Sequence, residues 1–241
     1  MQPLHKVYYF EKNIYLIKAG QEASPSIPYE IKSTTPGLIS EEIVAFLKKE
    51  TDSHFLHANE FEHWNISRKM LTIPLSVYDP QCKDTYWERM FGASSKDYQV
   101  EEYSNKSLNI ELIYEVPLWL NGFLRMHFNK QFSHSIVGEI LADSKKGGLQ
   151  MDMVIEKGHF IFSLRNDREL YYLNVHAYDS IEDVLYTLLN VITRQNKKLD
   201  NVTCNLFGFC STLTVQTLQE NLKKIKLLES IEFKTCVKPF L

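Results

Sequence analysis

Hydrophobic and polar positions alternate along residues 149–164 in a way that predicts two paired strands. Large apolar side chains occupy every second position from Leu149 to Ile155, and a period of two places alternate side chains on opposite faces of a strand. The alternation stops at Lys157-Gly158, where a two-residue turn with glycine at positive φ forms a hairpin, and it resumes at residues 160–164. Aromatic and β-branched residues at 170–175 predict a third antiparallel strand.

The spacing then changes to that of helices alternating with strands. Ser180 and Asp183 have the spacing of a capping box, and apolar residues from Ile181 to Ile192 follow at helical intervals. This half is completed by three elements. They are a short strand at 202–206, ended by Gly208, a second amphipathic helix at 215–225 and a last strand at 230–233. Since a strand reached through a helix lies parallel to its neighbour, this order predicts three antiparallel strands with a parallel extension.

This order of elements is that of the ribonuclease H-like unit, and two such units in one chain build the actin-like ATPases. The first half is less regular, but its local patterns allow a worn version of the same unit. We expect a hairpin around Glu11-Lys12-Asn13 and a helix capped by Ser40. Further strands are expected at 29–31, 68–77 and 109–116, and further helices at 81–91 and 118–128. Residues 94–107 are polar and are expected to form a link or an excursion. Residues 51–64 carry no assignable pattern, and residues 135–141 fit a short strand or helix.

The sequence therefore predicts an α/β fold of two ribonuclease H-like subdomains in the actin-like ATPase architecture. We expect a degenerate N-terminal subdomain at residues 1–142, a linker at 143–148 and a C-terminal subdomain at 149–241. The glycines and charged residues from Asp143 to Gly148 are typical of a linker.

The composition disfavours nucleic-acid and membrane partners. The 241 residues carry a net charge of −3, with lysine and arginine spread along the chain, so no general attraction to phosphate backbones or anionic lipids is expected. We find neither an apolar run of membrane-spanning length nor the core of a secretion signal, and we expect a cytoplasmic protein. The four cysteines lack paired spacing, which argues against zinc and disulfides; they are Cys82, Cys204, Cys210 and Cys236.

The chain also resembles a bacterial family of unknown function, found mainly in Bacteroidetes, whose fold is actin-like. The likeness is densest at the hairpin around Glu156-Lys157-Gly158, at residues 178–186 and in the strand ending at Gly208. It extends back to Pro74 through Val116-Pro117 and Phe132-Ser133-His134-Ser135, whereas the first 65 residues depart from it. The resemblance implies a shortened first subdomain and, because genes of this family lie beside an rRNA methyltransferase, a link to rRNA modification.

Two hairpins would hold the phosphates of ATP in an actin-like ATPase. Such hairpins carry Asp-x-Gly, because backbone amides must approach the phosphates and the acid holds metal-bound water. The second hairpin has Glu156, Gly158 and His159 at these positions, and the first, Glu11-Lys12-Asn13, has no glycine. Glu156, Gly158 and His159 are thus the candidate phosphate site, and Gly208, the single glycine where an adenosine loop would lie, is a weaker candidate.

Two metal-dependent chemistries are also disfavoured. A ribonuclease H-type nuclease needs several carboxylates around two metal ions. Asp152 lies where the first would fall, but the fourth strand contributes no acid, so we expect Asp152 to face solvent. The series His54, His57, Glu60 and His63 would stack on one helical face, which could hold a metal ion, but a polar loop or an exposed helix is the favoured interpretation of this spacing.

The leading hypothesis is a non-catalytic, actin-like scaffold that binds another macromolecule, with an unidentified protein as its partner. We predict no catalytic residues, no metal ligands and no cofactor. The alternative is a divergent ATP-binding protein that uses magnesium and the loop at Glu156 to His159, and a ribonuclease H-like nuclease relative is a third, less favoured class.

Overall fold

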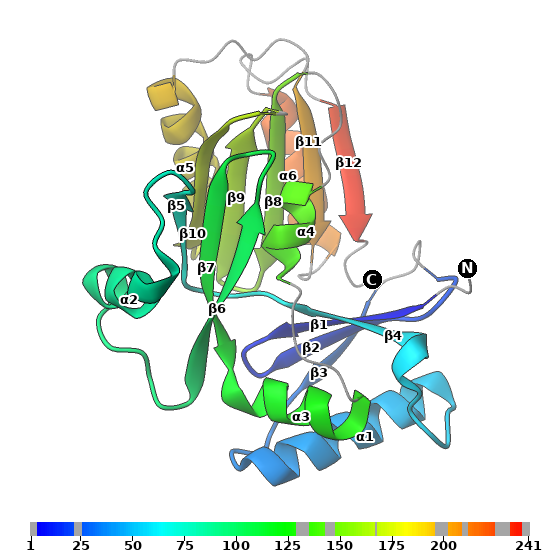
Figure 1. The fold of residues 1–241 in the computed structure, drawn as a ribbon. Coiled ribbons are helices and arrows are strands. Elements are labelled where there is room, and N and C mark those ends of the chain that lie inside the picture. Colours follow the sequence, from blue (N-terminus) through cyan, green and yellow to red (C-terminus); the bar gives the residue numbers. More distant parts are fainter. Residues whose placement is uncertain are drawn as a thin grey trace. The chain divides into compact units, whose positions relative to one another are not determined.

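The chain folds into two compact units in a computed structural model (Figure 1). The structure describes residues 4–21, 26–128, 135–142, 148–166, 168–195, 202–208, 212–224 and 232–237. The first unit comprises Met1–Ser104 and Glu111–Leu141, and the second comprises Asn105–Ile110 and Ala142–Leu241. Within the described residues, no helix is both long and apolar enough to cross a membrane.

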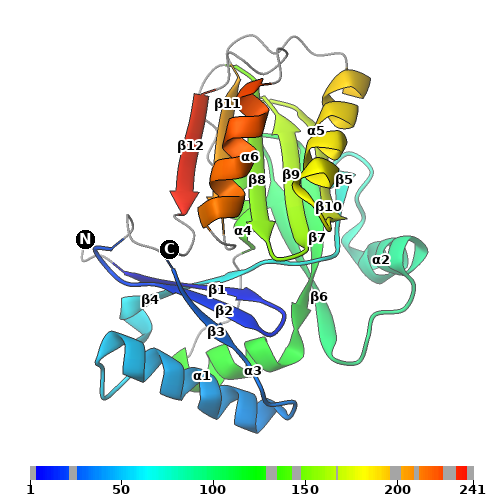
Figure 2. The same ribbon diagram turned by 180° about the vertical axis from the view of Figure 1, so that it is seen from behind.

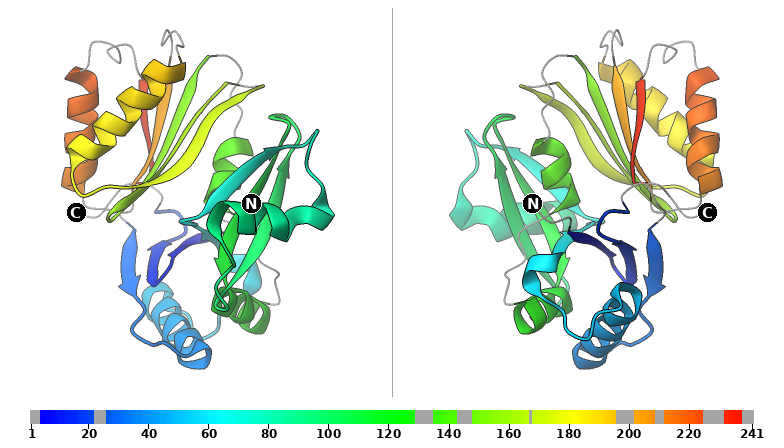
Figure 3. Two further views of the ribbon diagram at one scale, coloured as in Figure 1. Left: turned by 90° about the vertical axis from the view of Figure 1, so that its left-hand side faces the viewer. Right: turned by 90° about the vertical axis from the view of Figure 1, so that its right-hand side faces the viewer.

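The first unit is built on a four-stranded sheet with the order β3-β2-β1-β4. Its elements are β1 (His5–Phe10), β2 (Asn13–Ile17), β3 (Ile27–Glu30), α1 (Pro36–Thr51), η1 (Ala58–Glu60), β4 (Phe61–Asn65), α3 (Leu118–Phe128) and α4 (Ile136–Ala142). The first three strands are antiparallel, and β4 returns parallel to β1 after α1. Helices α1 and α3 contact each other and cover one face of this sheet (Figure 3).

Beyond β4, one further bridge joins Asn65 of β4 to Ser135 in parallel orientation. Within the described residues, the main sheet of the first unit therefore consists of four strands and this bridge.

A second, three-stranded sheet interrupts the first unit between β4 and α3. Its order is β5-β7-β6, and its elements are β5 (Met70–Pro74), η2 (Pro80–Cys82), α2 (Lys83–Phe91), β6 (Tyr98–Asn105) and β7 (Ile110–Pro117). A small core of Ile73, Trp87 and Ile113 joins α2 to these strands.

Three predictions for the first half were wrong. The fourth strand of the main sheet is β4, inside the unassigned stretch, whereas the strands predicted at 68–77 and 109–116 form the inserted sheet. The polar link predicted at 94–107 contains β6, an edge strand with polar residues because much of it faces solvent. Helix α1 begins at Pro36, whose fixed φ suits the first helical position, and Ser40 is buried inside the helix.

The second unit has the predicted order of strands, β10-β9-β8-β11-β12. Its elements are β8 (Gln150–Glu156), β9 (His159–Arg165), β10 (Leu170–Ala177), α5 (Ile181–Gln195), β11 (Thr203–Gly208), α6 (Thr212–Lys224) and β12 (Glu232–Val237). Strands β8, β9 and β10 are antiparallel, and β11 and β12 extend the sheet in parallel. This pairing confirms the ribonuclease H-like unit.

Both helices of the second unit cover one face of its sheet (Figure 2). The apolar side of β8, with Met151 and Met153, packs under Val184 and Leu188 of α5. The predicted capping box is present, since the Asp183 amide donates to Ser180 Oγ and the Ser180 amide donates to Asp183 Oδ2 at 2.9 Å. Several predicted features lie outside the described residues: linker residues 143–147, the stretch Phe132–His134 and Cys210.

We expect Leu188→Ala to lower the free energy of unfolding of the second unit by roughly 2 to 5 kcal/mol, because this fully buried side chain would leave a cavity under the sheet. Urea denaturation followed by circular dichroism measures the effect. Tyr186→Ala is the matched control on the same helix, because this side chain is 73% exposed and its loss is expected to change stability by less than about 0.5 kcal/mol. Equal losses in both variants would contradict the packing of α5.

Candidate functional site

Two adjoining cavities in the first unit surround the turn between β1 and β2. The smaller has a volume of about 260 Å³ and the larger about 560 Å³, a size typical of ligand sites. Both are lined by Glu11, Tyr98 and Pro117. We call the two cavities together the hairpin groove.

Paired charges line the smaller cavity. Glu11 lies at the turn with a φ of 51°. Its Oε1 atom forms an ion pair with Arg68 Nη1 at a distance of 2.9 Å. The Arg68 guanidinium also lies 5.1 Å from the centre of the Phe10 ring. Lys69 Nζ lies 3.5 Å from Glu115 Oε1. The cations that could meet a phosphate here already face carboxylates, which would repel it.

Buried hydrogen bonds hold the wall of this cavity. Asn65, the last residue of β4, donates from Nδ2 to Ser67 Oγ at 2.8 Å and to the Glu115 carbonyl oxygen at 2.9 Å. Ser67 Oγ donates to the same carbonyl. These contacts connect the main sheet to β7, and they fix the position of the residues that follow β4.

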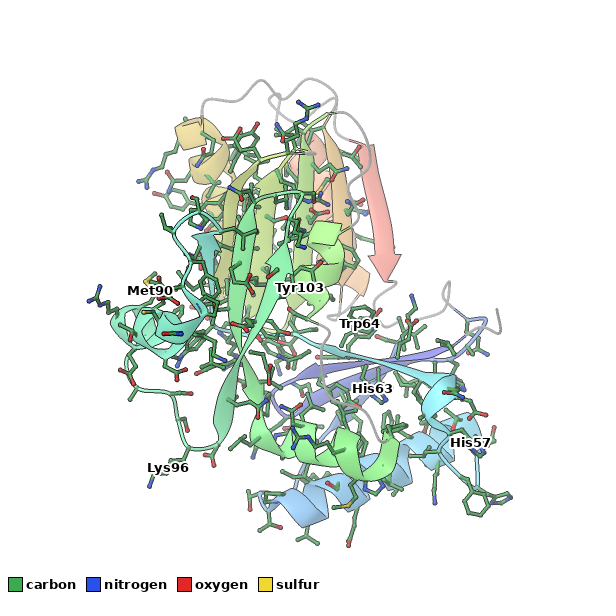
Figure 4. All side chains as sticks on the ribbon, in the orientation of Figure 1. His57, His63, Trp64, Met90, Lys96 and Tyr103 are labelled. Carbon is green, nitrogen blue, oxygen red and sulfur yellow. The ribbon has the colours of Figure 1, made fainter. Side chains whose placement is uncertain are left out.

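The larger cavity combines apolar side chains with two lysines. Its apolar lining includes Leu118, which is 44% exposed, and Trp119 at the start of α3, with Ile31 and Ile39 on the side of β3 and α1. Lys12 lines it from the turn and Lys96 from the loop before β6, where Figure 4 labels it. Neither lysine forms an ion pair within the described part of the chain. Glu11 and Asp97 line the same cavity, so it combines apolar side chains with charges of both signs.

Glu42 of α1 shapes one rim of the larger cavity through the segment between β3 and α1. Its carboxylate accepts from the backbone amides of Lys32 and Ser33, at 3.2 and 2.9 Å, and from the Tyr29 hydroxyl at 3.0 Å. Partial burial by itself would raise the pKa of Glu42, but these hydrogen bonds outweigh it and lower the pKa to about 2.

The second hairpin brings together the predicted candidates of the second unit. Glu156 and His159 face each other across the turn, and Gly158 has a φ of 78°. The Tyr178 amide donates to the Gly158 carbonyl oxygen at 2.9 Å. The Tyr178 hydroxyl donates to the backbone carbonyl oxygen of Glu156, also at 2.9 Å. Gly208 pairs with Ile155, so it lies at the same end of the sheet.

The features needed for phosphate binding are only partly present at this second hairpin. Glu156 is buried, with 2% of its surface exposed, and a Cβ atom added to Gly158 would meet only a carbonyl oxygen at 4.0 Å. Glycine is therefore favoured here because it adopts the positive φ of the turn, and not because another group approaches its Cα closely. Whether these residues hold a nucleotide remains a prediction.

Asp152 does not face solvent, contrary to expectation. Only 3% of its surface is exposed, and its carboxylate lies on the face of the sheet opposite α5 and α6. Oδ2 accepts from Arg165 Nε at 3.1 Å and from Ser163 Oγ at 3.0 Å, and Oδ1 accepts from Asn205 Nδ2 at 2.6 Å. Alternation placed Asp152 opposite Met151 correctly, but both faces of β8 are buried. The Arg165 guanidinium therefore contacts the Asp152 carboxylate, which a nuclease would use to hold a metal ion.

The histidine series does not form a common face. His57 directly precedes η1, whereas His63 lies in β4, where it is buried and its Nδ1 lies 2.8 Å from the Tyr9 hydroxyl (Figure 4). Burial raises the pKa of Tyr9 well above its usual value. Among the described residues, no group of histidine, cysteine and acidic side chains could hold a metal ion. The helical spacing failed because the chain enters a strand at Phe61.

Sequence reasoning missed the hairpin groove. Its residues come from the β1–β2 turn, the end of β4, the loop before β6 and the start of α3, which are distant in the sequence. The only available signal was the lack of a glycine in the first hairpin, Glu11-Lys12-Asn13.

We expect Arg165→Met to destabilise the second unit by roughly 3 to 5 kcal/mol, because it leaves the Asp152 carboxylate buried without its cation. The double variant Asp152→Leu, Arg165→Met is expected to recover a large part of this loss, since no unpaired charge then remains. Urea denaturation of wild type, single and double variants measures both. A single variant as stable as wild type would contradict the structural role of this pair.

Glu42→Gln is expected to reduce the pH dependence of stability between about pH 5 and pH 2. The folded pKa of Glu42 is below its unfolded value, so the unfolded chain binds the proton more readily and wild type loses this stabilisation as the pH falls. Melting temperatures measured across this range should converge at low pH, and parallel curves for the two proteins would contradict the expectation. Glu41→Gln, an exposed neighbour in the same helix, is the control.

Comparison with known proteins identifies the family and supports the fold. A protein of known structure from Bacteroides thetaiotaomicron, with an actin-like ATPase fold and unknown function, superimposes with a TM-score of 0.68 at 14% identity, covering 97% of this chain and 91% of that one. The type IV pilus biogenesis complex PilM–PilN gives a TM-score of 0.52 at 10% identity, covering 97% and 88%. No curated protein matches the chain. The model of one family, described as a protein of unknown function (DUF3822), matches residues 23–226, and the chain belongs to this family.

Proposed function

We propose that the protein is a non-catalytic scaffold that binds a segment of a partner protein in the hairpin groove. The observation that carries this proposal is the ion pair of 2.9 Å between Glu11 and Arg68 at the first hairpin. An ATPase of this architecture needs, at that turn, backbone amides that can approach the phosphates and an acid that can hold metal-bound water. Here the Glu11 carboxylate is paired with the Arg68 guanidinium, and the turn has no glycine.

The larger cavity supports a peptide as the occupant. Leu118 and Trp119 offer an apolar surface. Glu11 and Asp97 line the same cavity, but Lys12 and Lys96 form no ion pair in the described part of the chain and are the groups that a carboxylate of the segment would meet. A buried apolar anchor beside a few polar contacts is the usual arrangement of a peptide site. The fold is compatible with such a role, since the similar PilM was solved in a complex with PilN.

The residues of the second hairpin, Glu156 to His159, are poorly suited to bind ATP. Glu156 takes the place of the usual aspartate and is buried, and the carbonyl oxygens of Glu156 and Gly158 are bonded to Tyr178. Isothermal titration with ATP and magnesium is expected to give no saturable heat. Saturable binding that Gly158→Val abolishes would overturn the proposal in favour of a divergent ATP-binding protein.

We expect two groove variants, Leu118→Asp and Lys96→Glu, to lose the partner. Selection of peptides from a random displayed library on the wild-type protein provides the probe, and fluorescence anisotropy measures the affinity of the selected peptides. Loss of one good apolar anchor is expected to weaken binding at least about tenfold. Selected peptides should combine an apolar residue with an acidic one.

The matched control is Met126→Asp, which introduces the same charge at a 74% exposed position of the same helix, α3. It should bind as wild type does. Peptides that bind all three variants equally would place the binding surface elsewhere and contradict the proposal.

A further inference from the structure

Strand β10 forms one edge of the sheet of the second unit, and beyond an irregularity between Leu170 and Tyr172 it lacks the usual protection of an edge. It is eight residues long and pairs on one side with β9. Its sequence, LYYLNVHA, contains no lysine, arginine, aspartate, glutamate or proline. An edge strand exposes unpaired amides and carbonyls, and proteins normally guard such edges with charges, prolines or short length.

The four other edge strands whose side chains are described carry such protection. Strand β3 has Pro28 and Glu30, and β5 is five residues long and ends at Pro74. Strand β6 has Glu101 and Glu102, and β4 has Glu62 and a bridge to Ser135. The open edge of β10 is therefore a specific feature of this strand and not of the whole protein.

Two hydrogen bonds show which backbone groups of β10 face the open edge. The Tyr178 amide donates to the Gly158 carbonyl, so it points toward the β9 side. The Val175 amide donates at 2.8 Å to the side-chain oxygen of Asn174, so it points away from β9. Because amides alternate in direction along a strand, Leu173, Val175 and Ala177 present their N–H and C=O groups to the edge.

We propose that β10 pairs antiparallel with β10 of a second copy of the chain, around a two-fold axis at Val175. In this register the two Val175 residues exchange backbone hydrogen bonds, and Leu173 exchanges them with Ala177 of the second copy. On the helix-covered face, Asn174 lies opposite His176 and Tyr172 lies opposite Tyr178 of the second copy.

The chemistry of the strand favours a second copy as the occupant. A two-fold axis brings identical residues close together, so any charge on the strand would face a like charge, and β10 carries no acidic or basic side chain other than His176. Burial lowers the pKa of His176, which keeps its ring neutral at pH 7. Since one strand pair is smaller than a standard interface, the dimer forms weakly and depends on concentration.

Asn174 regulates the strength of this pairing. It is exposed, and its side chain occupies the Val175 amide that the second copy needs. Dimer formation must break this bond in both copies. Asn174→Ala leaves the amide open in both copies and is expected to lower the dimer dissociation constant by about fivefold to a hundredfold, the net effect of two ordinary hydrogen bonds.

Sedimentation velocity over about 10 µM to 1 mM tests the proposal, because complexes of this size are expected to dissociate in this range. Wild type should shift from monomer toward dimer, and Asn174→Ala should shift at lower concentration. Val175→Pro removes an amide that does not pair with β9, so the strand is retained while dimerisation is lost. Asn174→Lys should also abolish dimerisation, because it brings two positive charges near the two-fold axis.

Tyr186→Lys is the control, because it adds the same charge at an exposed position of the second unit outside the strand. Circular dichroism confirms that each variant is folded, and Asn174→Lys keeps the test decisive if Val175→Pro unfolds. A monomer at every concentration in both wild type and Asn174→Ala would overturn the proposal. A dimer that persists in Asn174→Lys would also overturn it, and neither result depends on the hairpin groove.

Discussion

The carboxylate of Asp152 joins three neighbouring strands at the centre of the second sheet. It accepts hydrogen bonds from Arg165 and Ser163 on β9 and from Asn205 on β11, and every one of these residues is buried. A charge in such a place costs several kcal/mol of desolvation unless a cation and further donors compensate it. The arrangement of β8, β9 and β11 therefore has to be maintained, and the packing of α5 and α6 on the other face depends on it.

The charged residues discussed for the first unit are also paired, but most of them are partly exposed, so burial is not the reason for their pairing. Arg68 is paired with Glu11, Lys69 with Glu115, and the Glu42 carboxylate with two backbone amides. A catalytic site needs charged groups that remain available to a substrate or metal. At the positions where actin-like ATPases and ribonuclease H-like nucleases perform chemistry, this chain uses its charges for internal contacts. This pattern favours a binding role, and it directs attention to the lysines of the hairpin groove that remain unpaired.

The two proposed surfaces differ in their chemistry. The hairpin groove is a pair of cavities lined by apolar side chains and by charges of both signs, so it suits a peptide with a defined sequence. The edge of β10 offers backbone groups, which recognise another strand largely irrespective of its side chains. Charges and prolines on other edge strands oppose the addition of a strand there, and β10 carries neither.

The second half of the fold followed from local signals in the sequence. Period-two alternation, the glycine of the Lys157-Gly158 turn and the capping box at Ser180 all act between residues near in the chain, so each predicted its element correctly. The first half was harder, because its sheet is interrupted by an insertion. Strand β4 has a polar pattern, yet His63 and Asn65 within it are buried, so its sequence does not distinguish it from a loop.

The amino-acid pattern alone was enough to predict the order of elements in the second unit and the family resemblance, and it shows that both hairpins lack Asp-x-Gly. The folded chain was needed to learn that Asp152 is buried, that Glu11 pairs with Arg68, and that β10 lies at an edge of its sheet. Alternation along one strand shows which residues share a face, but not what covers that face or which strand lies beside it. Those contacts join residues distant in the sequence, and they arise only when the sheet has assembled.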